Sequence, residues 1–371
     1  MDVISSTDRY QAVSTTNATP VRECFDFSGN GAEYFRIWIV NLMLTILTLG
    51  IYSAWAKVRR NRYIYGNISL ADHRLDYIAS PLVILRGRLI ALGLLVVVVL
   101  SEAFFPPLWI GSGLALSLLA PWLLVRSRMF NMRYTVYRNI RFGFRPAYLS
   151  AYKVIYLYGI LSVLSLGLFV PYAHFGRNEL IVGNTRYGAL EFHLASVPGK
   201  FYRAYLQGVL LSLLFVTPLF FIDWPRVNPL ADAEPGLSAF VYGLIPMIVI
   251  VLFLYTVAKY VAALLLRATT NNTTITDSSD SSQSFREHSH QLGCDWSLSG
   301  MLWIYVTNTL MIVLTLGLFL PWAQMRILKY QLEHTWVDVS GDLGAVIAGQ
   351  AQHVSSIGEE IGDVFDIDVG L

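Results

Sequence analysis

The chain has 371 residues, of which 55% are hydrophobic and 14% are charged, and its mean hydropathy is +0.51. This composition excludes an ordinary soluble domain and predicts a membrane protein. The formal net charge of +2 indicates no class of partner, and the two cysteines, Cys24 and Cys294, exclude a disulfide framework.

Residues 1–20 are polar and lack the basic start and apolar core of a secretory signal peptide. Six uncharged runs follow that are near or above the roughly 20 residues a helix needs to cross a bilayer. They are Ile37–Ala56, Ala103–Val125, Val154–Ala173, Ala204–Ile222, Pro235–Ala258 and Trp296–Met325. A shorter run, Leu89–Ser101, can be extended by flanking residues. About seven membrane segments are therefore predicted.

Three of these runs end in similar phrases: "TLGIYSAWAKVR" from Thr48, "SLGLFVPYAHFG" from Ser165 and "TLGLFLPWAQMR" from Thr315. A polar residue follows the aromatic residue of such a phrase at constant spacing, and a short alternating segment typical of a strand comes next. These polar residues are Asn67, Asn184, Asn272 and His334, with a looser copy at Asn139. The pattern indicates an internal repeat.

The chain is therefore expected to have a polar N-terminal tail (1–24), a membrane domain (25–337) and an acidic C-terminal tail (338–371). The membrane domain would contain about five helix–turn–helix–strand units, at approximately 25–80, 81–145, 146–195, 196–290 and 291–337. Three interpretations of the acidic tail stay open: it is solvated, it docks against the basic region Arg59–Arg88, or it binds a basic partner.

Basic residues predict the orientation. Lys57–Arg88 holds seven basic residues against two acids, and Arg126–Lys153 holds seven against none, which places the strand segments in the cytoplasm. If each short unit crosses the membrane once, the basic segment 177–203 falls on the wrong side. A shallow hairpin that enters and returns avoids this conflict, so both topologies stay open.

The stretch "FRIWIVNLMLTILTLGIYSAWAKVRRNRYIYGN", followed by "HRLDYIASPLVILRGRLIA", resembles the YjgN-like family of bacterial inner-membrane proteins. The resemblance extends from about Phe25 to the closing "DVFDIDVGL". It implies a multi-pass protein with a domain of unknown function and supplies no catalytic residues. Ile68 stands where such a family would be expected to have Thr, and His334 stands where it would have Asn.

Interrupted helices at matching places in repeats indicate a transport site, because freed backbone groups are tolerated only in protein or beside water. The candidate lining of a substrate path is Asn41, Thr48, Gly50, Ser165, Gly167, Asn308, Thr315 and Gly317. The alternative is structural: the glycine ends a helix, the hydroxyl caps it and the asparagine bonds a neighbouring helix. Both interpretations stay open.

Aromatic and basic residues just after the turns are expected to anchor the protein at the membrane interface. They are Trp55, Lys57, Arg59, Arg60, Tyr172, Trp322 and Arg326. The basic loops are expected to contact anionic headgroups of the bilayer, and nucleic acid is not an expected partner. No protein partner is indicated.

Catalytic motifs such as a Walker loop, G-x-S-x-G or H-E-x-x-H are missing from the sequence, so no enzyme and no cofactor are expected. "EHSHQLGC" contains three metal-ligand types, His288, His290 and Cys294. It adjoins a Ser- and Thr-rich stretch typical of a solvated loop, so no metal site is predicted.

The expected fold is an all-α multi-pass protein of the bacterial inner membrane, built of helical hairpins with short cytoplasmic β segments. The expected function is transport or permeation of a small molecule, ion or lipid through the broken helices. The alternative is a non-transporting membrane scaffold or envelope-associated interaction protein.

Overall fold

The computed structural model describes residues 20–104, 108–220, 237–277 and 289–340. Strands and helices alternate along the chain. The strands are β1 (Val21–Phe27), β2 (Ile68–Leu70), β3 (His73–Tyr77), β4 (Thr135–Tyr137), β5 (Ile140–Phe144), β6 (Thr185–Tyr187), β7 (Leu190–Leu194), β8 (Thr273–Asp277), β9 (His290–Cys294) and β10 (Thr335–Val339).

Helices lie between the two strands of each odd–even pair. The shorter ones are α1 (Gly31–Leu47), α2 (Ser53–Gly66), α5 (Tyr148–Tyr152), the π-helical η1 (Lys153–Leu157), α6 (Tyr158–Leu164), α7 (Val170–Val182), α11 (Leu298–Leu314) and α12 (Leu320–Glu333). The longer ones are α3 (Pro81–Phe104), α4 (Leu108–Arg133), α8 (Pro198–Phe220) and α10 (Leu237–Thr270).

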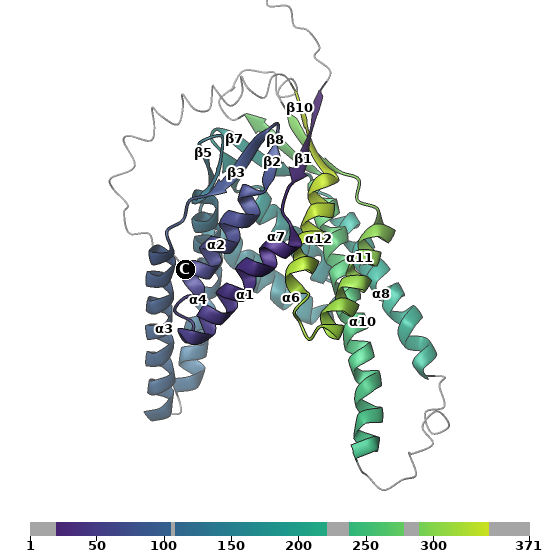
Figure 1. Ribbon diagram of the computed structural model, residues 1–371. Helices are drawn as coiled ribbons and strands as arrows, with labels where there is room; N and C mark the ends of the chain where they lie inside the picture. The colour runs from purple at the N-terminus through teal and green to yellow at the C-terminus, as the bar shows by residue number, and fades with distance from the viewer. Residues whose placement is uncertain (1–19, 105–107, 221–236, 278–288, 341–371) are drawn as a thin grey trace, which may run out of the picture.

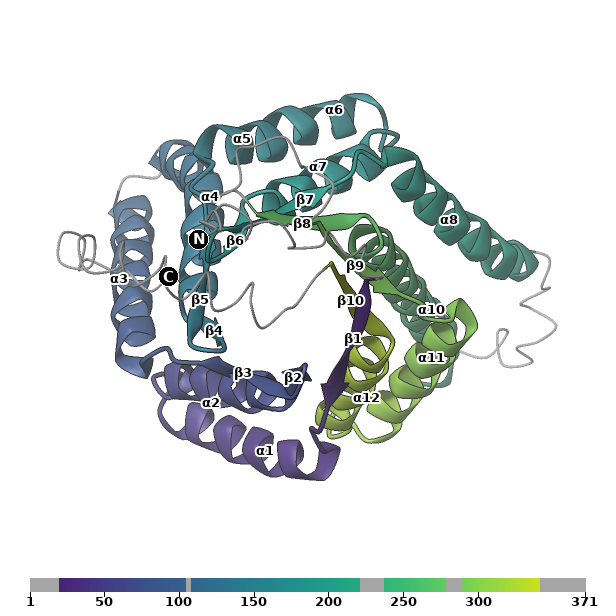
Figure 2. The ribbon, with the colours of Figure 1, turned by 90° about the horizontal axis from the view of Figure 1, so that it is seen from above.

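The ten strands form one closed antiparallel barrel in the order β1-β10-β9-β8-β7-β6-β5-β4-β3-β2, and β2 pairs with β1 to close it. Figure 2 shows the strands inside a ring of helices. The prediction of an all-α fold with isolated β segments is therefore wrong. Each strand is only three to seven residues long, so its signal is weak in the sequence, and pairing within the barrel supplies its stability.

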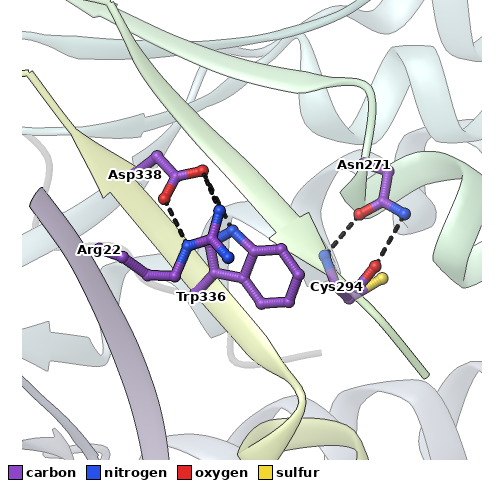
Figure 3. A network of polar contacts seen from close by, with 5 residues as sticks. All are labelled: Arg22, Asn271, Cys294, Trp336 and Asp338. Carbon is purple, nitrogen blue, oxygen red and sulfur yellow. Dashed lines mark hydrogen bonds and ion pairs between the residues drawn. The ribbon is translucent and has the colours of Figure 1, made fainter. Parts of the chain in front are cut away.

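The ends of the described chain meet where the barrel closes. Val21 on β1 is in register with Val339 on β10. On the same strands, Arg22 Nε donates to Asp338 Oδ1 at 2.8 Å, and the guanidinium lies 4.1 Å from the centre of the Trp336 ring. Figure 3 shows this contact beside a second link, in which Asn271 bonds both backbone groups of Cys294.

One face of the barrel is apolar. Tyr137, Ile140, Tyr187, Leu190 and Ile275 form a buried cluster, and apolar side chains of β2, β3 and β9 pack against it. The Tyr187 hydroxyl donates to the Tyr137 carbonyl two strands away, at 3.0 Å. Side chains reach across a curved sheet most easily on its concave side, so this cluster occupies the inner face. Charged residues such as Arg74 and Arg141 are exposed on the alternating positions.

The helix-to-strand junctions explain the spaced polar residues. The side chains of Asn67, Asn184, Asn272 and His334 each contact the carbonyl four residues earlier, at 2.6 to 2.9 Å. The backbone carbonyl of each accepts from an amide just past the preceding strand, at 2.8 to 3.2 Å. The Asn or His thus joins the end of a helix to the barrel.

Asn139 does not belong with this group, so the looser copy in the sequence was placed wrongly. It lies in the β4–β5 turn with φ of +65°, beside Arg138 with φ of +45°. Tyr134 precedes β4, and its carbonyl accepts from Ile78 N at 3.0 Å. A short polar side chain tolerates the left-handed region of a tight hairpin turn, which produced the misleading match.

The three short hairpins turn in the same way. Gly50, Gly167 and Gly317 have φ of +93°, +91° and +92°, a region open to glycine. Each glycine amide donates to the carbonyl five residues earlier, at 2.7 or 2.8 Å. The leucine before each glycine is 94–96% exposed. Large apolar side chains therefore form the tips.

Helix length separates two classes of hairpin. The first helices of the short hairpins span 17 residues, Gly31–Leu47, Tyr148–Leu164 and Leu298–Leu314. At 1.5 Å per residue this is about 25 Å, less than the roughly 30 Å hydrocarbon core. Among the described residues, three helices are long and apolar enough to span a membrane: Pro81–Ser101, Ile110–Arg133 and Met247–Thr270. The prediction of about seven membrane segments was therefore too high. Hydropathy depends on composition, and it does not show that the apolar helices of the short hairpins are too short to span a bilayer.

All hairpins leave the barrel in the same direction. In Figure 1 the strands lie at the top and every helix pair points downward. The α3–α4 and α8–α10 pairs extend beyond the tips of the short hairpins, as two separate arms. The first residues of the even-numbered strands, of which Ile68 on β2 is the earliest and Thr335 on β10 the last, therefore lie at one end of the molecule.

Candidate cavities beside the short hairpins

Asn41 on α1 and Asn308 on α11 occupy matching places, each nine residues before a turn glycine. They are 8% and 3% exposed, so both amides are buried. Each lines a cavity between a short hairpin and a neighbouring long helix. Their hydrogen bonding differs. The nitrogen and the oxygen of the Asn308 amide each have a partner, while the buried Asn41 Oδ1 has none in the part of the chain that the structure describes.

The first cavity, of about 380 Å³, lies between α1, α2 and α3. Its polar lining includes Asn41, Thr45 and Ser53, and its charged lining is Lys57, Arg60 and Arg88. Trp38 and Leu42 supply apolar walls. We refer to this space as the hairpin-1 cavity. No carboxylate is among its lining residues, so its charge is uniformly positive wherever the described side chains face it.

The cations of the hairpin-1 cavity are held close together. Arg88 Nη1 donates to the Ser53 hydroxyl, which donates in turn to the Gly50 carbonyl, so Arg88 is tied to the end of the hairpin. Burial lowers the pKa of the Lys57 ammonium, and the nearby Arg88 and Arg60 lower it further. Like charges in a partly desolvated space repel one another, which an incoming anion would relieve.

The second cavity, of about 330 Å³, lies between α10, α11 and α12. Here Asn308 Nδ2 donates to the Ala323 carbonyl at 3.3 Å, and Asn308 Oδ1 accepts from Arg326 Nη1 at 2.7 Å. Lys259 is the cation among the lining residues. We refer to this space as the hairpin-5 cavity. The Asn308 amide is therefore hydrogen-bonded within the protein.

The turn residues predicted as path lining lie elsewhere. Each hydroxyl of Thr48, Ser165 and Thr315 accepts from the backbone amide four residues on, at 2.9 to 3.0 Å. Gly50 and Gly167 have open space where a Cβ would be. These residues, with Gly317, form the exposed tips, and none of them lines the two cavities.

The predicted interface anchors divide into two groups. Trp55 packs against the buried cluster around Tyr77, and the Trp322 ring stacks on Phe35 with centroids 4.5 Å apart. Tyr172 lies edge-on to Tyr158 at 5.5 Å. These three aromatics hold helices together. Lys57 and Arg60 line the hairpin-1 cavity, Arg326 bonds Asn308, and Arg59 is exposed.

Arg88 and Ser53 were not predicted as site residues. Arg88 is the last charged residue before the uncharged run Leu89–Ser101, which marks the expected depth of the headgroups. That position could have indicated Arg88 as a residue that contacts a headgroup. The contact with Ser53 depends on how α3 packs against α2, which the sequence pattern does not report.

The other candidate residues from the sequence give no evidence of a site. His288 lies outside the described residues, as do the acidic residues after 340. His290 and Cys294 are buried at opposite ends of β9, and burial raises the pKa of the Cys294 thiol to about 11. Among the residues with a described placement, no three His, Cys, Asp or Glu side chains are grouped as a metal site would need.

Residues 22–364 match a family described as bacterial protein of unknown function (DUF898). The chain belongs to this family. The match confirms the resemblance to YjgN-like proteins drawn from the hairpin motif. No solved structure matches the chain.

Three proteins named inner membrane protein YjgN are similar to it. That of Salmonella typhimurium strain LT2 is 25% identical, over 86% of this chain and 89% of the relative. That of Escherichia coli O157:H7 is 32% identical over 38% of this chain and 36% of its own length. That of Escherichia coli K12 is 47% identical over 14% of this chain and 13% of its own length.

Proposed function

We propose that this protein is a multi-pass inner-membrane protein that binds an amphiphilic ligand from the bilayer and passes it between helices, without catalysis. The location rests on the names of the relatives, which are inner membrane proteins, and on the three apolar helices. The binding rests on one observation above all. Buried amides, Asn41 and Asn308, line lateral cavities that have polar and apolar walls.

We also propose that the chain contains five strand–helix–helix–strand repeats. The three glycine turns with φ near +92°, and the matching carbonyl contacts at the helix-to-strand junctions, support this division. Units one, three and five would re-enter the membrane as short hairpins, while units two and four would cross it. Short hairpins keep all ten strands on one side.

The proposed topology has four crossings, α3, α4, α8 and α10. Helix α8 is required because β7 and β8 are neighbours in the barrel, so the chain that leaves along one helix must return along the other. The basic segments 57–88 and 126–153 adjoin the barrel end, which by the positive-inside rule faces the cytoplasm.

Cysteine accessibility tests this topology. In a variant with Cys24→Ser and Cys294→Ala, single cysteines replace Asp72 and Asn139 in the barrel turns, or Ile110 at the far end of α4. An impermeant thiol reagent on intact spheroplasts should label position 110 and spare positions 72 and 139. Labelling at 72 or 139 would place the barrel outside and overturn the orientation.

A lateral rather than axial route is proposed because the inner face of the barrel is apolar. Fluorescent phospholipid in proteoliposomes, bleached from outside by dithionite, measures passage between leaflets. The protein should accelerate loss of the protected half of the signal, and Asn41→Leu together with Asn308→Leu should slow it at least tenfold. A wild-type rate equal to that of protein-free liposomes contradicts the transport proposal.

The second candidate is a non-transporting scaffold. Charged side chains on the outer face of the barrel, including Arg74, Arg141 and His193, are exposed and could bind a soluble partner. A scaffold would also be inactive in the liposome assay. It would bind its partner equally well with Asn41→Leu and Asn308→Leu, since both residues are remote from the barrel.

A further inference from the structure

The hairpin-1 cavity combines three cations with one unused acceptor. Lys57, Arg60 and Arg88 line it, and its described lining contains no acid. Fixed positive charge in a partly desolvated place favours an anion, and guanidinium groups bind phosphate oxygens particularly well. The Ser53 contact holds the Arg88 guanidinium at the cavity wall.

The unused acceptor is Asn41 Oδ1. The residue is 92% buried, and this oxygen has no hydrogen-bond partner in the described chain. Leaving a buried polar atom unpaired is costly, so native structures rarely do so without a water or a ligand. An anion alone cannot satisfy an acceptor, because it offers no donor. A ligand that satisfies this oxygen directly therefore carries an O–H or N–H beside its negative charge.

The hairpin-5 cavity is the internal comparison. Asn308 has the same position, but Arg326 donates to its Oδ1 at 2.7 Å. In hairpin 1 the residue at the same distance past the glycine is Arg59, which is exposed and does not line the cavity. Of the two matching amide oxygens, the one without a partner in the described part of the chain is therefore the one beside the three cations.

The depth of the cavity suits a headgroup. Arg88 is followed by the uncharged run Leu89–Ser101, so it marks the boundary between charged and hydrocarbon levels. Asn41 lies seven residues before Thr48, about 10 Å from the hairpin tip along the helix. Leu47 and Leu49 at that tip are 77% and 96% exposed, as expected for side chains among acyl chains.

We infer that the hairpin-1 cavity binds a phosphate ester that carries a hydroxyl group, with the phosphate against Lys57, Arg60 and Arg88 and the hydroxyl donating to Asn41 Oδ1. This rests on the proposed placement of the hairpin in the membrane. The chemistry is shared by phosphatidylglycerol in the bilayer and by free glycerol phosphates in the cytoplasm. A zwitterionic ammonium headgroup fits less well because its cation would face three others.

Retained lipid measures the inference directly. The full-length protein is purified from nanodiscs of equal phosphatidylglycerol, phosphatidylmethanol and phosphatidylcholine, and the bound lipid is counted by native mass spectrometry. Both anionic lipids should exceed phosphatidylcholine at least tenfold, and phosphatidylglycerol should exceed phosphatidylmethanol at least threefold. Phosphatidylmethanol has the same charge and lacks the hydroxyl.

Variants separate the two parts of the site. Lys57→Gln with Arg88→Gln should abolish the anionic preference, whereas Asn41→Leu should equalise phosphatidylglycerol and phosphatidylmethanol while both stay above phosphatidylcholine. Arg74→Gln and Arg141→Gln, which remove exposed cations on the outer face of the barrel, are charge-loss controls and should leave both ratios unchanged. An anionic preference that survives Lys57→Gln with Arg88→Gln, or a hydroxyl preference that survives Asn41→Leu, overturns the inference. Because Asn41 Oδ1 has no partner among the described residues, Asn41→Leu should fold normally.

A competition arm identifies the source of the ligand. If glycerol 3-phosphate at millimolar concentration displaces the retained lipid, the site binds the soluble headgroup; if only short-chain phosphatidylglycerol displaces it, the lipid is the ligand. Lipid binding without transfer in the liposome assay would overturn the transport proposal and support this site. Transfer with no selective retention would do the reverse.

Discussion

Arg22 and Asp338 join the first and last strands of the barrel through two hydrogen bonds of 2.8 and 3.1 Å. The two residues are 316 positions apart in the sequence. The bond holds the two ends of the described chain in one sheet, so the ring of helices is closed by strand pairing. The contact is exposed, and its contribution to stability is correspondingly modest.

This closing contact should make stability depend on acid pH. The Arg22 hydrogen bond is the main cause that lowers the pKa of the Asp338 carboxyl, and Trp336 Nε1 donates to the same group. A lowered folded-state pKa stabilises the protein above the unfolded value, about 3.9, and this contribution disappears as pH falls through the folded value.

Arg22→Gln should therefore melt at a slightly lower temperature than the wild type at pH 7. The difference should shrink as the pH drops below about 4. Thermal melts in detergent between pH 7 and pH 2.5 measure it, with Arg74→Gln on β3 as a control for general charge loss. A difference that is constant across this range would show that the ion pair is not its cause.

Replacing a turn glycine should lower the stability of the protein through backbone strain alone. A Cβ at Gly167 would meet nothing within 4 Å, but its φ of +91° is unfavourable for an L-residue. Gly167→Ala should cost about 1 kcal/mol or more of unfolding free energy. Gly159→Ala is the matched control, because that site is helical and equally open. The control should stabilise or be neutral, and equal losses at both sites would refute the explanation.

The threonine that begins several strands should cap the preceding helix. Thr273 is 2% exposed, and its hydroxyl donates to the Thr269 carbonyl at 2.8 Å. Thr273→Val keeps the shape and leaves that carbonyl with only the 3.2 Å bond from Asn272 N, so it should cost about 1 kcal/mol. Thr270→Val is the control, since water can replace the exposed bond that Thr270 makes to Leu266. Denaturant titration in detergent measures the unfolding free energy of both variants, and an equal loss in both would contradict the role given to Thr273.

The hairpin tips should lie among the acyl chains. Leu166 is 94% exposed and stands beside Leu164 and Leu168, which are 74% and 76% exposed. An environment-sensitive dye on Leu166→Cys in nanodiscs should emit at shorter wavelength and be quenched by nitroxides on the acyl chains. The same dye on Asp72→Cys, in a barrel turn, should show neither effect. A water-like spectrum at position 166 would remove the short hairpins from the bilayer.

Composition and local spacing determined much of this protein. Uncharged runs identified a membrane class, and the Gly turns at 50, 167 and 317 depend on local backbone geometry that a short phrase encodes. The polar residues Asn67, Asn184, Asn272 and His334 were visible because each bonds within its own helix turn. Family membership followed from the same phrases.

Tertiary structure decided the rest. The closed barrel depends on pairs such as Val21 with Val339, whose separation no local pattern records. Helix length in space, not apolar composition, separated the short hairpins from the helices that are long enough to span a membrane. The two buried asparagines look alike in sequence, yet Arg326 occupies Asn308 while Asn41 faces three cations, because only packing determines which side chain reaches a buried amide.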